Sequence, residues 1–190
     1  MKIIFVRHGL TPANEQRLYC GSTNNFLSPA GIQQVKKAAK ALKKEKIDVW
    51  LCGDSRRTRQ TLKIIFDELV LPYEDIIVRK DIKEVDFGKF ENFSFDEVSF
   101  KYPDEAKQYL DNWQEFTFPG GDNVKEYFYN CEKSIFDIID CYKDKNICII
   151  GHKGYISSCL CAIDELGLDF MFDINIKCGE MIAVDFEEQR

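Results

Sequence analysis

The stretch IIFVRHG, residues 3–9, decides how the rest of the chain is read. Its four consecutive apolar residues are typical of a short strand that is buried on both faces, as in a parallel sheet covered by helices. A second stretch of this kind, residues 147–150, runs into Gly151 and His152. The chain has two histidines, and each follows a predicted buried strand directly. Because ligands bind beyond the carboxyl ends of the strands in open α/β sheets, we expect His8 and His152 to meet at that edge.

Strand and helix patterns alternate along the chain, which predicts an α/β fold of three layers, α/β/α, with a mostly parallel central sheet. Further strands are predicted at residues 48–52 and at residues 181–186, the last at an edge of the sheet. Ser28 and Pro29 form a cap and a first helical residue. Apolar residues at helical spacing then predict helices at residues 32–42, 62–69, 124–142 and 156–166, with Asp122 as the cap of the third.

Residues 87–121 fit this alternation least well because they are rich in aromatic side chains. We predict a single domain over residues 1–190, in which this segment is an insertion that folds over the sheet. It forms either a satellite hydrophobic cluster or a cap that shapes a substrate pocket. The aromatic residues are Phe90, Phe93, Phe95, Phe100, Tyr102, Tyr109, Trp113, Phe116 and Phe118.

The composition predicts a soluble globular protein of the cytoplasm. The 190 residues are 45% hydrophobic and 31% charged, with a formal net charge of -6. This charge argues against nucleic acid and anionic membranes as partners, although a local arginine cluster is still able to attract an anionic substrate. The apolar run at residues 3–6 is too short for an export signal. The eight cysteines have no C-x-x-C spacing, so we expect reduced thiols.

Two converging histidines suit either a metal ion or an anion. No carboxylate or cysteine accompanies either histidine at ligand spacing, and Arg7 would place a permanent positive charge beside a metal ion. We therefore expect no metal. The planar guanidinium of arginine matches phosphate oxygens, and Arg56, Arg57 and Arg59 follow the predicted strand at residues 48–52.

These residues resemble the histidine phosphatase superfamily, also called the phosphoglycerate-mutase-like family. Residues 7–14, RHGLTPAN, are similar to its R-H-G-x-T-x-x-N signature, and residues 57–61, RTRQT, to its R-A-x-Q-T helix start. Residues 84–88, EVDFG, resemble its E-x-x-F-G segment, and residues 151–152 resemble the segment that carries the second histidine. The four blocks occur in the family's order and extend over nearly the whole chain.

The resemblance implies a phosphatase without metal or cofactor that acts through a phosphohistidine intermediate. His8 would attack phosphorus and become phosphorylated. Arg7, Arg57 and His152 would bind the phosphoryl oxygens. Asn14 either joins these phosphate ligands or only caps a helix.

Glu84 is the general acid that the resemblance implies. It would protonate the leaving oxygen and then deprotonate the attacking water. Asp86 is a rival acid, because a residue two positions further along a strand faces the same side. The motif favours Glu84.

The substrate implied is a small phosphomonoester. Residues 19–28 and 111–122 are similar to segments of alpha-ribazole phosphatases, which suggests alpha-ribazole 5'-phosphate and cobalamin biosynthesis. A broad-specificity phosphatase, a mutase that keeps water from the phosphohistidine, and a catalytically silent module that binds a phosphorylated ligand are the alternatives. Lys153 departs from the family's usual small residue, and either adds positive charge near the substrate or reaches solvent.

Overall fold

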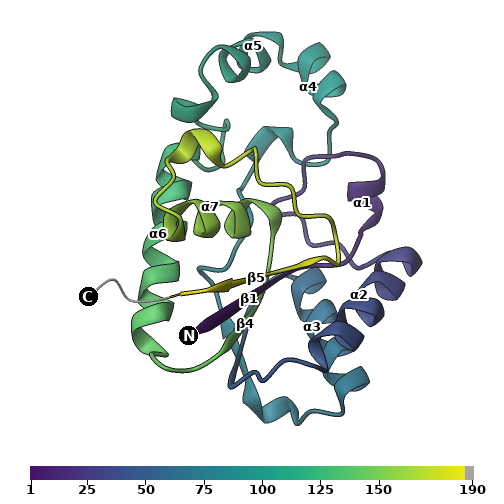
Figure 1. Ribbon diagram of the computed structural model, residues 1–190. Helices are drawn as coiled ribbons and strands as arrows, with labels where there is room; N and C mark the ends of the chain where they lie inside the picture. The colour runs from purple at the N-terminus through teal and green to yellow at the C-terminus, as the bar shows by residue number, and fades with distance from the viewer. Residues whose placement is uncertain (187–190) are drawn as a thin grey trace.

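A five-stranded sheet in the order β3-β2-β4-β1-β5 forms the centre of the structure, a computed structural model that describes residues 1–186 (Figure 1). The parallel strands are β1 (Lys2–Arg7), β2 (Val49–Gly53), β3 (Ile76–Arg79) and β4 (Ile147–Gly151). The last strand, β5 (Met181–Asp185), pairs antiparallel with β1 at one edge. The mostly parallel sheet is confirmed, including its late edge strand, but β3 was not predicted.

The apolar run of β1 is explained by the two faces of the sheet. Ile3 and Phe5 are fully buried in one hydrophobic cluster, and Ile4 and Val6 are fully buried in another on the opposite face. Side chains of a strand alternate between faces, so a strand that is covered on both sides carries apolar residues throughout.

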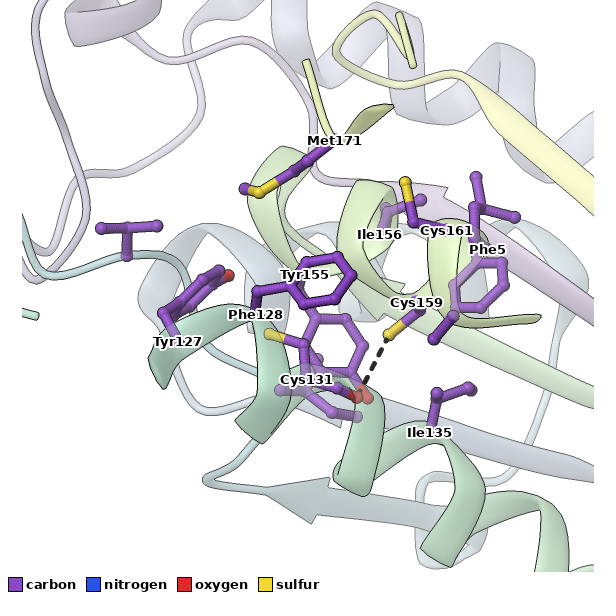
Figure 2. Packing of buried hydrophobic residues seen from close by; sticks show 14 of the residues in the cluster. Phe5, Tyr127, Phe128, Cys131, Ile135, Tyr155, Ile156, Cys159, Cys161 and Met171 are labelled. Carbon is purple, nitrogen blue, oxygen red and sulfur yellow. Dashed lines mark hydrogen bonds between the residues drawn. The ribbon is translucent and has the colours of Figure 1, made fainter. Parts of the chain in front are cut away.

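Helices cover both faces and complete the predicted three layers (Figure 1). On one side lie α2 (Pro29–Leu42) and α3 (Arg56–Leu69). On the other lie α6 (Val124–Cys141) and α7 (Lys153–Ile163). Figure 2 shows part of this second core, in which Phe128 and Cys131 of α6 pack beside Tyr155 and Cys159 of α7.

Of the two predicted helix N-caps, one is present in the structure and one is not. Ser28 caps α2 as predicted, since its side chain accepts a hydrogen bond from the Gly31 N–H at 3.2 Å. The predicted cap of the long helix, Asp122, was wrong. Asn123 is the N-cap of α6 and accepts from the Glu126 N–H at 3.0 Å, whereas Asp122 forms an ion pair with Lys83 at 2.8 Å.

The aromatic segment at residues 87–121 folds mainly into short helices. Within it Phe90, Phe116 and Phe118 pack ring against ring, with centroids 5.2 Å apart for Phe116 and Phe118 and 5.5 Å apart for Phe90 and Phe118. These rings join the core on the α6 and α7 side of the sheet. The short elements of the chain are α1 (Pro12–Glu15), α4 (Phe95–Lys101), α5 (Pro103–Asp111) and the 3₁₀ turns η1 (Tyr73–Asp75), η2 (Gly88–Phe90), η3 (Trp113–Glu115) and η4 (Leu168–Phe170).

Candidate active site

The two histidines leave neighbouring strands at the same edge of the sheet. Arg7 at the end of β1 pairs with Gly151 at the end of β4, so His8 and His152 emerge side by side. Their ring centroids are 5.3 Å apart with an interplanar angle of 65°. Both residues are almost completely buried. The convergence that the strand ends predict is therefore present.

His8 has a defined tautomer. Its Nδ1 lies 2.8 Å from the Gly9 carbonyl oxygen, which only accepts, so Nδ1 carries the proton. Burial, together with the charges of Arg57 and Arg7, holds the pKa of His8 well below its usual 6.5. The imidazole is thus neutral, and Nε2 carries a lone pair.

Glycine at residue 9 allows the chain to turn closely past α2. A Cβ atom there would lie 2.6 Å from the Gly31 carbonyl oxygen and 2.8 Å from Cγ2 of Val35. A larger residue would push the segment that carries His8 away from α2. The glycine of the R-H-G signature is therefore explained by steric crowding against α2.

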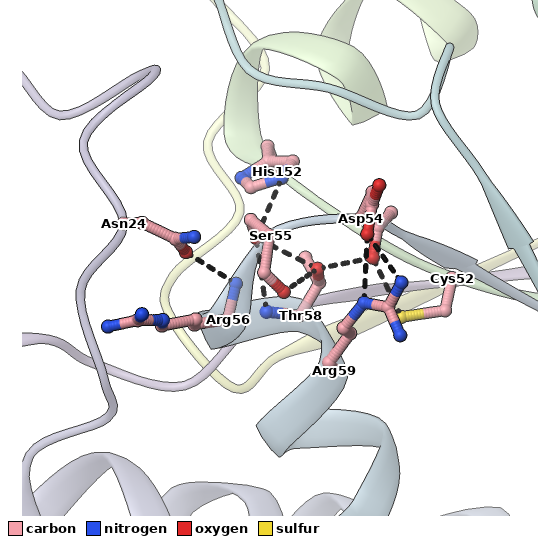
Figure 3. Close-up of polar contacts among 9 residues, drawn as sticks. Asn24, Cys52, Asp54, Ser55, Arg56, Thr58, Arg59 and His152 are labelled. Atoms are coloured by element: carbon pink, nitrogen blue, oxygen red, sulfur yellow. Dashed lines mark hydrogen bonds and ion pairs between the residues drawn. The ribbon is translucent and has the colours of Figure 1, made fainter.

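Arg57 is the arginine of α3 that enters the site. It is 1% exposed, whereas Arg56 and Arg59 are exposed, and Arg59 is turned toward Asp54 (Figure 3). Arg59 forms an ion pair with Asp54 at 2.5 Å. The guanidinium of Arg56 lies 5.2 Å from the ring centroid of the exposed Phe26, in the loop before α2.

Backbone carbonyl groups hold both Arg57, which is buried, and Arg7, which is half-buried. Arg57 donates to the carbonyl oxygens of Thr23 and Gly21, each at 2.8 Å, and of Cys20 at 3.3 Å. Arg7 donates to the carbonyl oxygen of Ile176 at 2.8 Å. In both side chains Nε is buried and has no hydrogen-bond partner among residues 1–186.

A third unpartnered buried atom belongs to His152. Its Nε2 lies 3.4 Å from Oγ of Ser55 (Figure 3), while Nδ1 has no hydrogen-bond partner in the described part of the chain. Burial and the neighbouring charges hold the pKa of His152 well below 6.5. Within residues 1–186 the only other such side-chain atom is Oγ of Ser157, on the wall of the adjoining cavity. Because buried polar atoms nearly always have partners, this concentration around two cationic arginines is suited to an anion.

Glu84 lies beside the start of α7. Its carboxylate accepts hydrogen bonds from the Gly154 N–H at 3.1 Å and from the Val85 N–H at 3.2 Å. Burial raises its pKa above the usual 4.5, and the charges of Arg57 and Arg7 oppose that rise. A carboxyl group in this environment retains a proton more readily than one in water.

Asp86, the rival acid, does not line the cavity that Glu84 lines. Residues 83–87 form no strand, so the expectation that Asp86 faces the same side as Glu84 was wrong. The Asp86 carboxylate accepts from the Gly88 N–H at 3.0 Å, and Asp86 is not among the residues that line the cavity.

Asn14 belongs to the capping box of α1, whose N-cap is Thr11. Its Oδ1 accepts from the Thr11 N–H at 3.2 Å and from the Thr11 hydroxyl at 2.9 Å, as the capping box of α1. Asn14 also lines the cavity.

A cavity of about 620 Å³ adjoins these groups. Arg7 and Glu84 belong to its wall, and Glu84 is the only carboxylate residue that lines it within the described chain. Its other lining residues include aromatic and cationic side chains beside aliphatic and neutral polar ones. The aromatic residues are Tyr19, Phe87, Phe95, Tyr109, Phe118 and Phe172, and the other cationic residues are Arg17, Lys153 and Lys177.

Arg17, Phe172 and Lys177 were not found from the sequence. They stand outside the four motifs, and no periodicity marks them. Only the packing of distant loops brings them to the cavity.

Other side-chain chemistry is sparse in residues 1–186. This part of the chain has no cluster of three or more His, Cys, Asp or Glu side chains that could hold a metal ion. All eight cysteines are free thiols, and Cys141 is the exposed one. No helix among these residues combines the length and hydropathy needed to cross a membrane.

Comparisons with known proteins point to one family. The chain is 22% identical over 189 residues to the adenosylcobalamin/alpha-ribazole phosphatase of Escherichia coli (100% of this chain, 92% of that protein). It is 24% identical over 196 residues to a 2,3-bisphosphoglycerate-dependent phosphoglycerate mutase of Parvibaculum lavamentivorans (98% and 91%). The fold is similar to the crystal structure of the alpha-ribazole phosphatase from Shigella flexneri, with a TM-score of 0.89, 22% identity, and coverage of 97% and 90%. The family model of the histidine phosphatase superfamily (branch 1) matches residues 3–190, and the chain therefore belongs to that superfamily.

Proposed function

We propose that this protein is a phosphomonoesterase that transfers the phosphoryl group of a small metabolite to His8 and then to water. The observation that carries the proposal is the pair of strand-end histidines. His8 keeps a lone pair on Nε2, its ring lies 5.3 Å from that of His152, and buried nitrogens of Arg7, Arg57 and His152 have no partner within residues 1–186. A nucleophile next to donors for phosphoryl oxygens is the arrangement that phosphoryl transfer needs.

In the first step Nε2 of His8 attacks phosphorus in line with the leaving oxygen. The N–P bond forms as the P–O bond breaks, and Glu84 gives its proton to the departing oxygen. Arg7, Arg57 and His152 bind the equatorial oxygens, where charge spreads in a loose transition state.

In the second step water attacks the phosphohistidine. Glu84, now a carboxylate, accepts a proton from that water, and the N–P bond breaks. Inorganic phosphate leaves, and His8 returns to its neutral state. The fixed charges of Arg7 and Arg57 balance the phosphate, so neither step requires a metal or another cofactor.

The cavity supports a substrate whose leaving group has an aromatic or apolar part. Residues 87–121 contribute Phe87, Phe95, Tyr109 and Phe118 to its walls, and we assign them the role of a substrate cap. Alpha-ribazole 5'-phosphate meets this description, and two of the relatives bear the name of the phosphatase that acts on it.

The composition supports a cellular compartment and argues against some partners. Eight free thiols are typical of a reducing compartment, and we assign the enzyme to the cytoplasm. A net charge of -6 favours neither nucleic acid nor an anionic membrane as a partner.

The test is turnover by the purified protein against a panel of phosphomonoesters that includes alpha-ribazole 5'-phosphate, p-nitrophenyl phosphate and 3-phosphoglycerate. We expect release of inorganic phosphate, abolished in a folded His8→Ala variant. Interconversion of phosphoglycerates without phosphate release would instead indicate a mutase. Binding of phosphate without turnover of any substrate would indicate a silent module and contradict the proposal.

A further inference from the structure

Glu91, which follows η2, accepts five hydrogen bonds through one carboxylate. Oε1 accepts from the backbone N–H groups of Gly21 at 2.8 Å, Ser22 at 3.0 Å and Phe87 at 3.2 Å. Oε2 accepts from the N–H of Thr23 at 3.2 Å and from its hydroxyl at 2.6 Å. Three consecutive amides of the loop at residues 20–23 are therefore fixed by a side chain that is not among those lining the cavity.

The carbonyl groups of that same loop hold Arg57. The guanidinium donates to the carbonyl oxygens of Cys20, Gly21 and Thr23. Within residues 1–186 Arg57 forms no ion pair with a carboxylate. The loop thus presents its N–H groups to the Glu91 anion and its C=O groups to the Arg57 cation, and the peptide dipoles connect the two charges.

Glu91 also reaches the segment that carries Glu84. Its bond from the Phe87 N–H fixes that segment three residues after Glu84. The loop packs directly on the same segment, because a Cβ atom at Gly21 would lie 1.6 Å from the Val85 carbonyl oxygen. One carboxylate therefore connects the loop that holds Arg57 with the segment that holds the proposed acid.

We propose that Glu91 is a positioning residue for phosphate binding: it orders the loop at residues 20–23 so that the free edge of the Arg57 guanidinium faces the phosphoryl site. The inference rests on the proposed function, since Arg57 is there a phosphate ligand. Glu91 itself does not contact the substrate. Because Glu91 acts on phosphate affinity only through Arg57, its effect should disappear when Arg57 is replaced.

The experiment is a double-mutant cycle read by calorimetric binding of inorganic phosphate to the full-length protein. In Glu91→Gln an NH₂ group replaces one acceptor oxygen and meets N–H donors. We expect phosphate affinity to fall about tenfold, the scale of one lost bond to a charged group. In an Arg57→Ala background the same change should have no further effect, because the residue through which it acts is gone.

Glu97→Gln is the matched control. Glu97 accepts bonds from the N–H of Ser94 at 2.8 Å and from its hydroxyl at 3.0 Å, in the same insertion but without a bond to the loop. Phosphate affinity should be unchanged in this variant. If Glu91→Gln does not fold, Thr23→Val decides: it removes the 2.6 Å bond to Glu91 but keeps the Thr23 carbonyl that binds Arg57, and should weaken phosphate binding in the same direction.

Two results would overturn the inference. One is a folded Glu91→Gln, or failing that Thr23→Val, that binds phosphate as the wild type does. The other is a double mutant whose loss equals the product of the two single losses, since that would place the effect of Glu91 outside Arg57. A wild type that hydrolyses phosphomonoesters alongside either result would leave the proposed function standing. A wild type that neither binds phosphate nor turns over substrate would reject the proposed function and this inference with it.

Discussion

The backbone N–H of Gly154 donates to Oε1 of Glu84 at 3.1 Å, and a Cβ atom at residue 154 would lie 2.3 Å from the same oxygen. Gly154 is the second residue of α7, the helix that starts directly after His152. The helix that follows the second histidine therefore also fixes the carboxyl group that we propose as the acid. A donor at this position stabilises the carboxylate, and burial favours the protonated form.

Glu84→Gln should lower kcat/KM far more on alkyl phosphates than on p-nitrophenyl phosphate. An alkoxide is a poor leaving group and needs a proton, whereas p-nitrophenolate leaves without one. General acid catalysis contributes roughly 10²–10⁴-fold, and we expect a loss of that order on the alkyl substrates only. The comparison uses kcat/KM because it reports steps up to the first irreversible one.

Asp86→Asn is the control for that prediction. Its carboxylate is bound to the Gly88 N–H and does not line the cavity, so its removal should show no dependence on the leaving group. A selective loss in Asp86→Asn with a benign Glu84→Gln would show that the acid is wrongly assigned.

The pH dependence should follow from the two shifted pKa values. Glu84 must be protonated for the first step, and its pKa lies above 4.5, so kcat/KM for an alkyl phosphate falls as the pH rises through that raised pKa. His8 must be neutral, and its pKa lies well below 6.5, so the loss on the acid side begins well below pH 6.5. Measurement of kcat/KM across the acidic and neutral pH range tests both the acid limb and the basic limb of the pH profile.

Glu84→Gln is again informative in the pH experiment. The phosphate of the substrate titrates identically with both enzymes, so only a limb that belongs to Glu84 disappears in the variant. Persistence of the whole basic limb in Glu84→Gln would contradict the assignment.

Chelation should leave activity intact. In the proposed mechanism Arg7 and Arg57, both held by backbone carbonyls, balance the charge of the substrate phosphate. Prolonged EDTA treatment followed by an assay with p-nitrophenyl phosphate is the measurement. A loss of activity that zinc or magnesium restores would mean that a metal ion takes part.

Much of the fold and of the site could be predicted because both depend on local patterns. The buried strand of residues 147–150 shows as an unbroken apolar run, and parallel strands deliver the residues that follow them to one edge. Arg57 was chosen over its neighbours by spacing from Gln60 and Thr61, and it alone of the three arginines is buried.

What could not be predicted depends on tertiary packing. Strand β3 has four residues at the sheet edge, with Ile77 and Val78 exposed, which is too short for a periodic signal. The contacts of Glu91 require two loops to meet that are about 70 residues apart in the chain. Lys177 reaches the cavity from a loop before β5 that carries no motif.

Gly154→Ala should reproduce part of the Glu84→Gln defect without removing a titrating group. The added methyl group would displace Oε1 of Glu84, and a misplacement of about 1 Å can cost on the order of 10²-fold in rate. The loss should again be larger on alkyl phosphates than on p-nitrophenyl phosphate. Alanine favours helix more than glycine does, so circular dichroism should show a retained fold. An equal loss on both substrates would indicate damage to phosphate binding instead.

Lys153→Gln should reveal whether the enzyme prefers a leaving group with a second negative charge. Lys153 is partly buried and lines the cavity, and it stands in the chain between His152 and Gly154, whose N–H binds Glu84. In the proposed mechanism Glu84 protonates the leaving oxygen, so Lys153 should lie near the leaving group. O-phosphoserine and O-phosphoethanolamine form a matched pair of substrates, because they differ only in a carboxylate. We expect the wild type to favour O-phosphoserine by kcat/KM, and Lys153→Gln to reduce that preference about tenfold, the scale of one charged hydrogen bond.

Lys177→Gln is the comparison variant, since Lys177 is an exposed cation on the same cavity, and its effect on the ratio should be smaller. An unchanged ratio in Lys153→Gln would mean that Lys153 reaches solvent and takes no part in selecting the substrate.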